Sequence, residues 1–183
     1  MFSFIFDENF CQMNRISFLV LFLLMFTINY AQEKEHSTET VTTYYLIRHA
    51  EKDISNPTDK NPNLSSIGVQ RAESWTKILK NASFDAVYST DYNRTKQTAK
   101  PISETNNLET INYDLNTFDF EKFKSETKGK TIIIVGHSNT TPLFVNAFIG
   151  SQKYQQIKES NYSNLYIITI IGDTISDKLL TIN

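Results

Sequence analysis

The sequence contains only one cysteine, Cys11, which lies ahead of an apolar run near the N-terminus. A disulfide needs two cysteines, so the chain has no internal disulfide framework. If the N-terminal segment is cleaved, the mature chain also has no thiol. The composition of that mature chain excludes catalysis by a cysteine nucleophile as well as stabilisation by disulfide bonds.

An excess of charge of one sign is also missing. The 18 basic and 20 acidic residues leave a net charge of -2, and the 183 residues contain no basic stripe, internal repeat or low-complexity block. Nucleic-acid binding relies on clustered lysine and arginine, so no nucleic-acid partner is expected. The length suits one domain, and a hydrophobic content of 40% is that of an ordinary globular protein.

No apolar run has the usual length of a membrane-spanning helix. The most apolar segment, Ile16–Ile28, has 13 residues, whereas a spanning helix needs about 20. Arg15 precedes this run and Ala31, a small residue, follows it, which is typical of a secretory signal peptide. We therefore expect residues 1–31 to be a signal peptide, with Met13 as an alternative start. The mature protein would be periplasmic or secreted, without stable membrane association, and the asparagine, lysine and isoleucine bias favours a bacterial source.

After a polar tether at 32–40, residues 41–183 alternate between strand and helix patterns. The predicted strands are Val41–Ile47, Phe84–Thr90, Glu109–Asp114, Thr131–Val135, Leu165–Ile171 and Thr174–Ile182. The predicted helices begin after Ser65 or Ser66, at about Tyr92, at Phe118 (to Thr127) and at Thr140 (to Ile149). This alternation predicts an α/β fold, a three-layer α/β/α sandwich with a mainly parallel sheet. The last two strands, joined by a Gly-Asp turn, add an antiparallel C-terminal edge.

Basic residues stand at the carboxyl ends of three predicted strands. Arg48 and His49 follow the first strand, Arg94 lies just past the second, and His137 follows the fourth. In open α/β sheets, ligands bind at the carboxyl ends of the strands, near a topological switch point. We therefore expect these four side chains to meet in one pocket.

Two arginines and two histidines on one rim suit a dianion such as phosphate. Guanidinium groups bind phosphate oxygens in a bidentate manner, and a helix that begins after His137 adds backbone donors. A neutral imidazole is a competent nucleophile toward phosphorus. A metal site is the weaker interpretation, because no helical H-x-x-x-H spacing occurs and two arginines would repel a cation. No metal and no cofactor are expected.

Four segments, "RHAEK", "LSSIGVQRA", "YSTDYNRTKQTA" and "VGHSN", occur in this order along the chain. Together they resemble the histidine phosphatase superfamily, in particular its phosphoglycerate mutase-like and SixA-like members. The resemblance runs from about Tyr44 to the C-terminus and includes Gly68 and Gln70, for which it implies a structural role. One Arg-His pair alone would be weak support, whereas the ordered set is specific.

The resemblance implies a role for each of the four basic residues. His49 would be the nucleophile that forms a phosphohistidine intermediate, which water then hydrolyses. Arg48 and Arg94 would bind the phosphoryl oxygens. His137 would stabilise the equatorial oxygens in the transition state.

The proton donor for the leaving group has no clear counterpart. The acid-phosphatase branch places an aspartate after its second histidine, but this chain has Ser138 there. Family members often have glycine where this chain has Ala50, a variant also found in SixA-like proteins. Asp114, Asp119 and Glu121 are the candidate acids, with Asp119 favoured by spacing, and the alternative is that none of them serves.

The sequence thus predicts a metal-independent phosphatase that hydrolyses a small phosphomonoester, with a small phosphorylated molecule as its only expected partner. One alternative is a member of the same fold that binds phosphate without turnover. Another is a cytoplasmic SixA-like phosphohistidine phosphatase, if the signal peptide prediction is wrong. The sequence makes no prediction of oligomeric state.

Overall fold

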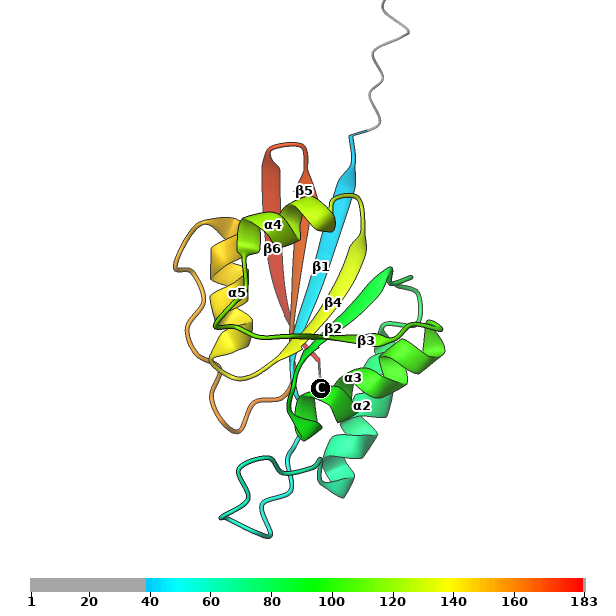
Figure 1. The fold of residues 1–183 in the computed structure, drawn as a ribbon, viewed down its shortest axis with the longest axis vertical. Coiled ribbons are helices and arrows are strands. Elements are labelled where there is room, and N and C mark those ends of the chain that lie inside the picture. The colour runs from blue at the N-terminus through cyan, green and yellow to red at the C-terminus, as the bar shows by residue number, and fades with distance from the viewer. Residues whose placement is uncertain (1–38, 183) are drawn as a thin grey trace, which may run out of the picture. The chain divides into compact units, whose positions relative to one another are not determined.

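The computed structural model describes residues 39–182. The predicted signal peptide and most of the predicted tether lie outside the described residues. Over the part that is described, no helix combines the length and the apolar character needed to cross a membrane. Figure 1 shows a central sheet with helices packed against it.

The sheet has six strands in the order β3-β2-β4-β1-β5-β6. Strands β1 to β4 run parallel to their neighbours, while β5 is antiparallel to β1 and β6 is antiparallel to β5. The strands are β1 (Val41–Arg48), β2 (Ala86–Thr90), β3 (Thr110–Tyr113), β4 (Thr131–Gly136), β5 (Asn164–Ile171) and β6 (Thr174–Thr181). The predicted mainly parallel sheet with an antiparallel C-terminal edge is confirmed.

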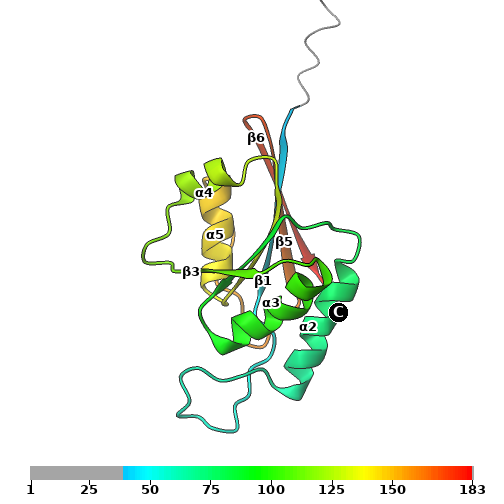
Figure 2. The same ribbon diagram turned by 45° about the vertical axis from the view of Figure 1, so that its right-hand side comes forward.

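Within residues 39–182, four helices cover the two faces of this sheet. They are α2 (Ser66–Ile78), α3 (Asn93–Thr105), α4 (Phe120–Glu126) and α5 (Thr140–Ile149). Helices α2 and α3 lie on one face and α4 and α5 on the other, as Figure 2 shows with the sheet turned toward its edge. The three-layer architecture predicted from the sequence is therefore confirmed.

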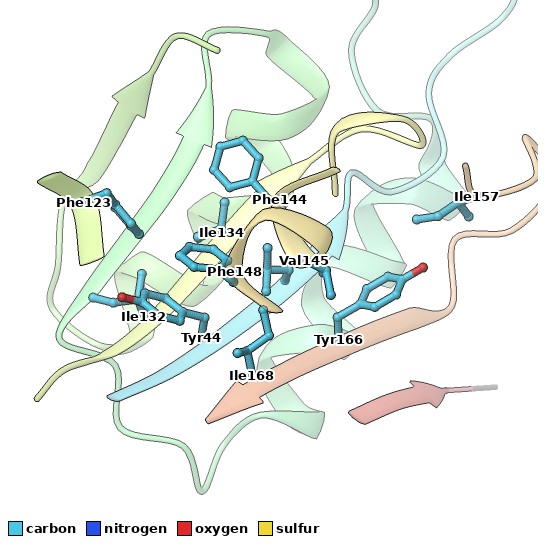
Figure 3. Packing of buried hydrophobic residues seen from close by; sticks show 11 residues of the cluster. Tyr44, Phe123, Ile132, Ile134, Phe144, Val145, Phe148, Ile157, Tyr166 and Ile168 are labelled. Atoms are coloured by element: carbon cyan, nitrogen blue, oxygen red, sulfur yellow. The ribbon is translucent and has the colours of Figure 1, made fainter. Parts of the chain in front are cut away.

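Strand β4 is buried on both faces, which explains its almost continuous apolar sequence, and the last three residues of β1 are buried as well. Alternate residues of each strand point to opposite layers. On one side Tyr44 stacks on Phe148 of α5, with ring centroids 4.3 Å apart, and packs near Phe123 of α4 (Figure 3). On the other side Ile47 and its neighbours pack with Trp75 of α2. These two cores fix both strands in place.

The element boundaries follow local capping and turn chemistry. Ser65 caps α2, since its side chain accepts a hydrogen bond from the Gly68 amide at 3.1 Å. Asp119 caps α4 in the same way through the Lys122 amide, so this helix begins two residues later than predicted. Gly172 has a φ of 55°, which suits the first central position of the two-residue β5–β6 turn.

The crossovers place a topological switch point between β1 and β4. After β1 the chain crosses to the α2 and α3 face, and after β4 it crosses to the α5 face. These two strands are adjacent, with Arg48 opposite Gly136 in the register. Such a divergence opens a crevice at the carboxyl ends of the two strands.

The "RHAEK" segment is fixed to α2 by close packing. A Cβ atom added at Gly68 would lie 2.1 Å from the backbone oxygen of Glu51. Glu51 also forms an ion pair with Arg71 of the same helix, at 2.7 Å. Only glycine therefore allows α2 to approach the backbone that follows His49 so closely.

We expect Gly68→Ala to destabilise the protein by at least about 2 kcal/mol, because the added methyl group meets backbone that cannot rotate away. The free energy of unfolding in urea measures this change. Ser74→Ala, at an exposed position of the same helix, is the control and should change stability by less than about 0.5 kcal/mol. Equal stability of the two variants would contradict this close packing.

Candidate active site

Two histidines meet where β1 and β4 end. The His49 amide donates to the Gly136 carbonyl at 2.9 Å, which extends the parallel pairing by one residue beyond the strands. His49 therefore lies beside His137, and their ring centroids are 5.3 Å apart. The sequence prediction that the strand ends bring these two residues together agrees with this geometry.

His49 has a buried ring with a defined orientation. Its side chain is buried, with 4% exposed, and its Nδ1 lies 2.7 Å from the Ala50 carbonyl oxygen. A carbonyl oxygen only accepts hydrogen bonds, so Nδ1 carries the proton and Nε2 has the free lone pair. The ring is therefore held in the tautomer that exposes a nucleophilic nitrogen.

His137 is held from two sides by residues of the second motif. Its Nε2 lies 2.9 Å from the Thr90 hydroxyl, and its Nδ1 lies 3.4 Å from the Arg94 guanidinium. Arginine is a donor only, so Nδ1 accepts and Nε2–H donates to Thr90. The ring of Tyr92 packs edge-on against His137, at 5.1 Å between centroids. The orientation of His137 is thus set by the segment that also carries Arg94.

The two arginines each keep an unused donor in the interior. The Nε atoms of Arg48 and Arg94 are buried and have no hydrogen-bond partner in the described part of the chain. A buried N–H without an acceptor is costly, and one on a charged group more so. Two such donors beside the paired histidines match the requirement of an anion with several oxygens.

These residues line one cavity of about 840 Å³. His49, His137, Arg48 and Arg94 form its inner end together with Thr90 and the start of α5. Lys52 also lines the cavity. The outer wall comes from Asp91 and Tyr92 after β2 and from the 112–116 segment, which includes the end of β3.

Both imidazoles are neutral at physiological pH. Burial lowers the pKa of His49 to about 3, with further lowering by the nearby arginines and His137. Burial also lowers the pKa of His137 to about 4, again aided by Arg94 and Arg48. A neutral His49 is the nucleophilic form, so the positive surroundings favour the reactive state while they attract an anion.

A sequence profile described as the Histidine phosphatase superfamily (branch 1) matches residues 44–123, which include "RHAEK" and Arg94. The C-terminal half of the site, with His137, lies beyond this match, and the structure brings it to the first two motifs. This match covers 80 of the 183 residues and supports the family that the four sequence motifs resemble. It supports a phosphatase in general terms and does not assign a substrate. No curated protein matches the sequence.

Solved structures share the fold of this chain. A candidate phosphohistidine phosphatase SixA from Agrobacterium tumefaciens is 21% identical, with a TM-score of 0.58, over 76% of this chain and 98% of that chain. A phosphoserine phosphatase mutant from Entamoeba histolytica, in complex with phosphoserine, is 15% identical, with a TM-score of 0.55. The match covers 75% of this chain and 95% of that chain. The phosphoglycerate mutase of Bacillus anthracis str. Sterne is 14% identical, with a TM-score of 0.59. The match covers 78% of this chain and 93% of that chain. Identities this low show the fold alone.

The three carboxyl groups considered as proton donors lie in different places. Asp119 caps α4 and is absent from the cavity lining, and Glu121 pairs with Lys124 at 2.7 Å. Asp114 lines the outer part of the cavity, where its Oδ1 accepts hydrogen bonds from Asn116. The position of Asp119 thus does not support the preference based on spacing, and only Asp114 has access to a bound molecule.

Sequence reasoning missed the segment between α5 and β5. Glu159 lines the cavity and forms an ion pair with Arg48 at 2.7 Å. Tyr162 places its ring against the same guanidinium, 4.2 Å from Arg48 Cζ. No periodicity or motif marks these two residues, because they lie in an irregular segment that reaches the site only through the tertiary fold.

The neutral histidines predict a specific loss of stability in acid. An unfolded histidine titrates near pH 6.5, whereas these two titrate at about 3 and about 4 in the folded protein. Between pH 6.5 and about 4 the unfolded chain therefore binds more protons, so the free energy of unfolding falls as the pH is lowered. The loss is at most about 1.4 kcal/mol per pH unit for each histidine.

Urea unfolding at a series of pH values from 7.5 to 4.5 tests this prediction. The control is the double variant His49→Gln/His137→Gln, which keeps every carboxyl group, so that carboxylate titration cancels in the comparison. We expect the wild-type protein to lose stability more steeply than the double variant. Parallel curves would show that the two imidazoles titrate normally.

Proposed function

We propose that this protein is a metal-independent phosphatase that hydrolyses a small phosphomonoester through a phosphohistidine at His49. The observation that carries the proposal is the tautomer of His49. Its Nδ1 is committed to the Ala50 carbonyl, which leaves Nε2 as a nucleophile at the inner end of the cavity. Phosphoryl transfer needs mainly positioning and charge neutralisation, and the two arginines supply the charge.

The proposed reaction has two steps. In the first, His49 Nε2 attacks phosphorus, the N–P bond forms, and the ester P–O bond breaks as the leaving oxygen takes a proton. In the second, water attacks phosphorus, the N–P bond breaks, and phosphate and a proton leave while the neutral imidazole is restored. The bound dianion favours a protonated His137, whose Nδ1 then gives up the hydrogen bond from Arg94 and donates to a phosphoryl oxygen.

The outer wall of the cavity favours a hydrophilic leaving group. Asp91 and Asp114 contribute carboxylates, and Asn112 and Asn116 contribute amides. These groups suit hydroxyl or ammonium groups of a ligand, while Tyr92, Tyr113 and Leu115 add apolar surface to the same wall. A phosphorylated sugar or a similar small polar ester fits this lining.

A phosphate-binding protein without turnover is the second candidate. It is favoured by the positions of the carboxyl groups, since Asp119 caps a helix and Glu121 pairs with a lysine. A poor leaving group needs a proton from some acid. Aryl phosphates and phosphoramidates depend less on such an acid, so substrates with good and poor leaving groups separate the two candidates.

We expect His49→Ala to abolish phosphate release while the fold is kept. The assay measures inorganic phosphate released by the 32–183 protein from p-nitrophenyl phosphate and from a panel of sugar, nucleotide and amino-acid phosphates. Lys100→Ala, at an exposed position of α3, is the control and should match the wild type. Full turnover in His49→Ala would exclude the proposed nucleophile, and phosphate binding without turnover in the wild type would support the second candidate.

We further propose that the protein is exported and acts in the periplasm or outside the cell, after removal of residues 1–31. The apolar run Ile16–Ile28 between Arg15 and Ala31 supports this proposal. N-terminal sequencing of the protein purified from fractionated cells should find a start near residue 32. An intact N-terminus in the cytoplasmic fraction would instead support the cytoplasmic SixA-like alternative.

A further inference from the structure

The segment Lys158–Tyr162, between α5 and β5, wraps around the guanidinium of Arg48. The Nη1 atom of Arg48 donates to the backbone carbonyls of Lys158, Glu159 and Asn161, at 3.1, 2.9 and 3.0 Å. Three carbonyl oxygens thus share the two hydrogens of one nitrogen. The side chain of Arg48 is 2% exposed, so these contacts hold it in the interior.

The carboxylate of Glu159 completes this arrangement and reaches a second motif. Its Oε2 accepts from Arg48 Nη2 at 2.7 Å, while its Oε1 accepts from the Ser138 hydroxyl at 2.8 Å. Ser138 directly follows His137. Glu159 therefore connects the arginine of the first motif to the residue next to the second histidine.

These contacts leave one edge of the Arg48 guanidinium free for a ligand. A guanidinium has five N–H donors, of which the 158–162 segment engages both of Nη1 and one of Nη2. The Nε–H is buried and has no partner among the described residues. In a guanidinium group the Nε–H lies on the same edge as one Nη2–H, and such a pair binds two oxygens of one phosphoryl group.

Glu159 is poorly suited to donate a proton. The hydrogen bond from Ser138 and the charge of Arg48 lower the pKa of Glu159, so it is a carboxylate at neutral pH. Both of its oxygens already accept hydrogen bonds from these two neighbours. Its side chain is 67% exposed, so the charge itself is largely screened by water and the geometry of the two hydrogen bonds matters more.

We propose that Glu159 is a positioning residue of the phosphate site, which holds Arg48 so that its Nε edge faces the phosphoryl group. Because Glu159 also accepts from Ser138, the residue after His137, the same carboxylate fixes the position of Arg48 relative to His137. The inference rests on the proposed function only in taking phosphate as the bound group. The 158–162 segment, which lies outside all four sequence motifs, thereby has a role in the phosphate site.

Glu159→Ala and Glu159→Gln test the inference in the 32–183 protein. Glutamine keeps both contacts without the charge, because its carbonyl accepts from Arg48 and its amide donates to the Ser138 hydroxyl. Isothermal calorimetry measures the affinity for inorganic phosphate, and steady-state kinetics with p-nitrophenyl phosphate measures kcat and KM. Glu104→Ala, which removes an exposed carboxylate on α3, is the control for net charge.

We expect Glu159→Ala to weaken phosphate binding by about tenfold, the order of one lost hydrogen bond to a charged group. Glu159→Gln should stay within about threefold of the wild type in phosphate affinity and in kcat. Unchanged affinity in Glu159→Ala would overturn the inference. So would a loss of kcat in Glu159→Gln as large as in Glu159→Ala, with phosphate affinity intact, because that pattern belongs to a proton-transfer group.

The calorimetric measurement separates this inference from the proposed hydrolysis. If wild-type protein binds phosphate but hydrolyses no ester, and Glu159→Ala still weakens binding, the phosphatase proposal fails and the positioning role stands. If esters are hydrolysed and Glu159→Ala binds phosphate normally, the positioning role fails alone. If wild-type protein does not bind phosphate, the premise of the inference is wrong.

Discussion

The parallel pairing of β1 with β4 is the constraint on which the site depends. Its register puts Arg48 opposite Gly136, and the next backbone hydrogen bond, from His49 to Gly136, fixes the two histidines side by side. A shift of one residue would turn every side chain of β1 to the other face of the sheet. The two cores of the sandwich forbid that shift, because Tyr44 and Ile47 already fill opposite layers. Site geometry is therefore a consequence of core packing.

The second constraint is electrostatic. Two guanidinium groups and two imidazoles share one cavity, and four positive charges there would repel one another strongly. Burial resolves the conflict because it lowers the pKa of His49 to about 3 and that of His137 to about 4, which keeps both imidazoles neutral. The carboxylate of Glu159, which contacts the Nη2 atom of Arg48, balances part of the positive charge of that guanidinium group. The cavity thus keeps its attraction for a dianion while His49 stays neutral.

Much of the fold could be predicted from the sequence because local and global signals agree. The continuous apolar run Thr131–Val135 predicted a strand buried on both faces, and α5 has the predicted bounds because Gly150, in a left-handed conformation, ends it. The predicted start of α4 was wrong by two residues, since Phe118 is apolar but Asp119 is the cap. The convergence of His49 and His137 followed from one rule, that parallel strands end at the same edge of the sheet.

The rest of the site could not be predicted, and the reason lies in the kind of contact involved. Three of the bonds that hold Arg48 go to backbone carbonyls, which every residue has, so no side-chain pattern marks the segment that provides them. Glu159 is one of 20 acidic residues, and it lies 111 positions from its partner. In this fold the strands place the basic side chains at one edge of the sheet, and the irregular 158–162 segment orients Arg48. The placement by the strands follows from sequence periodicity, whereas the contacts of the irregular segment do not.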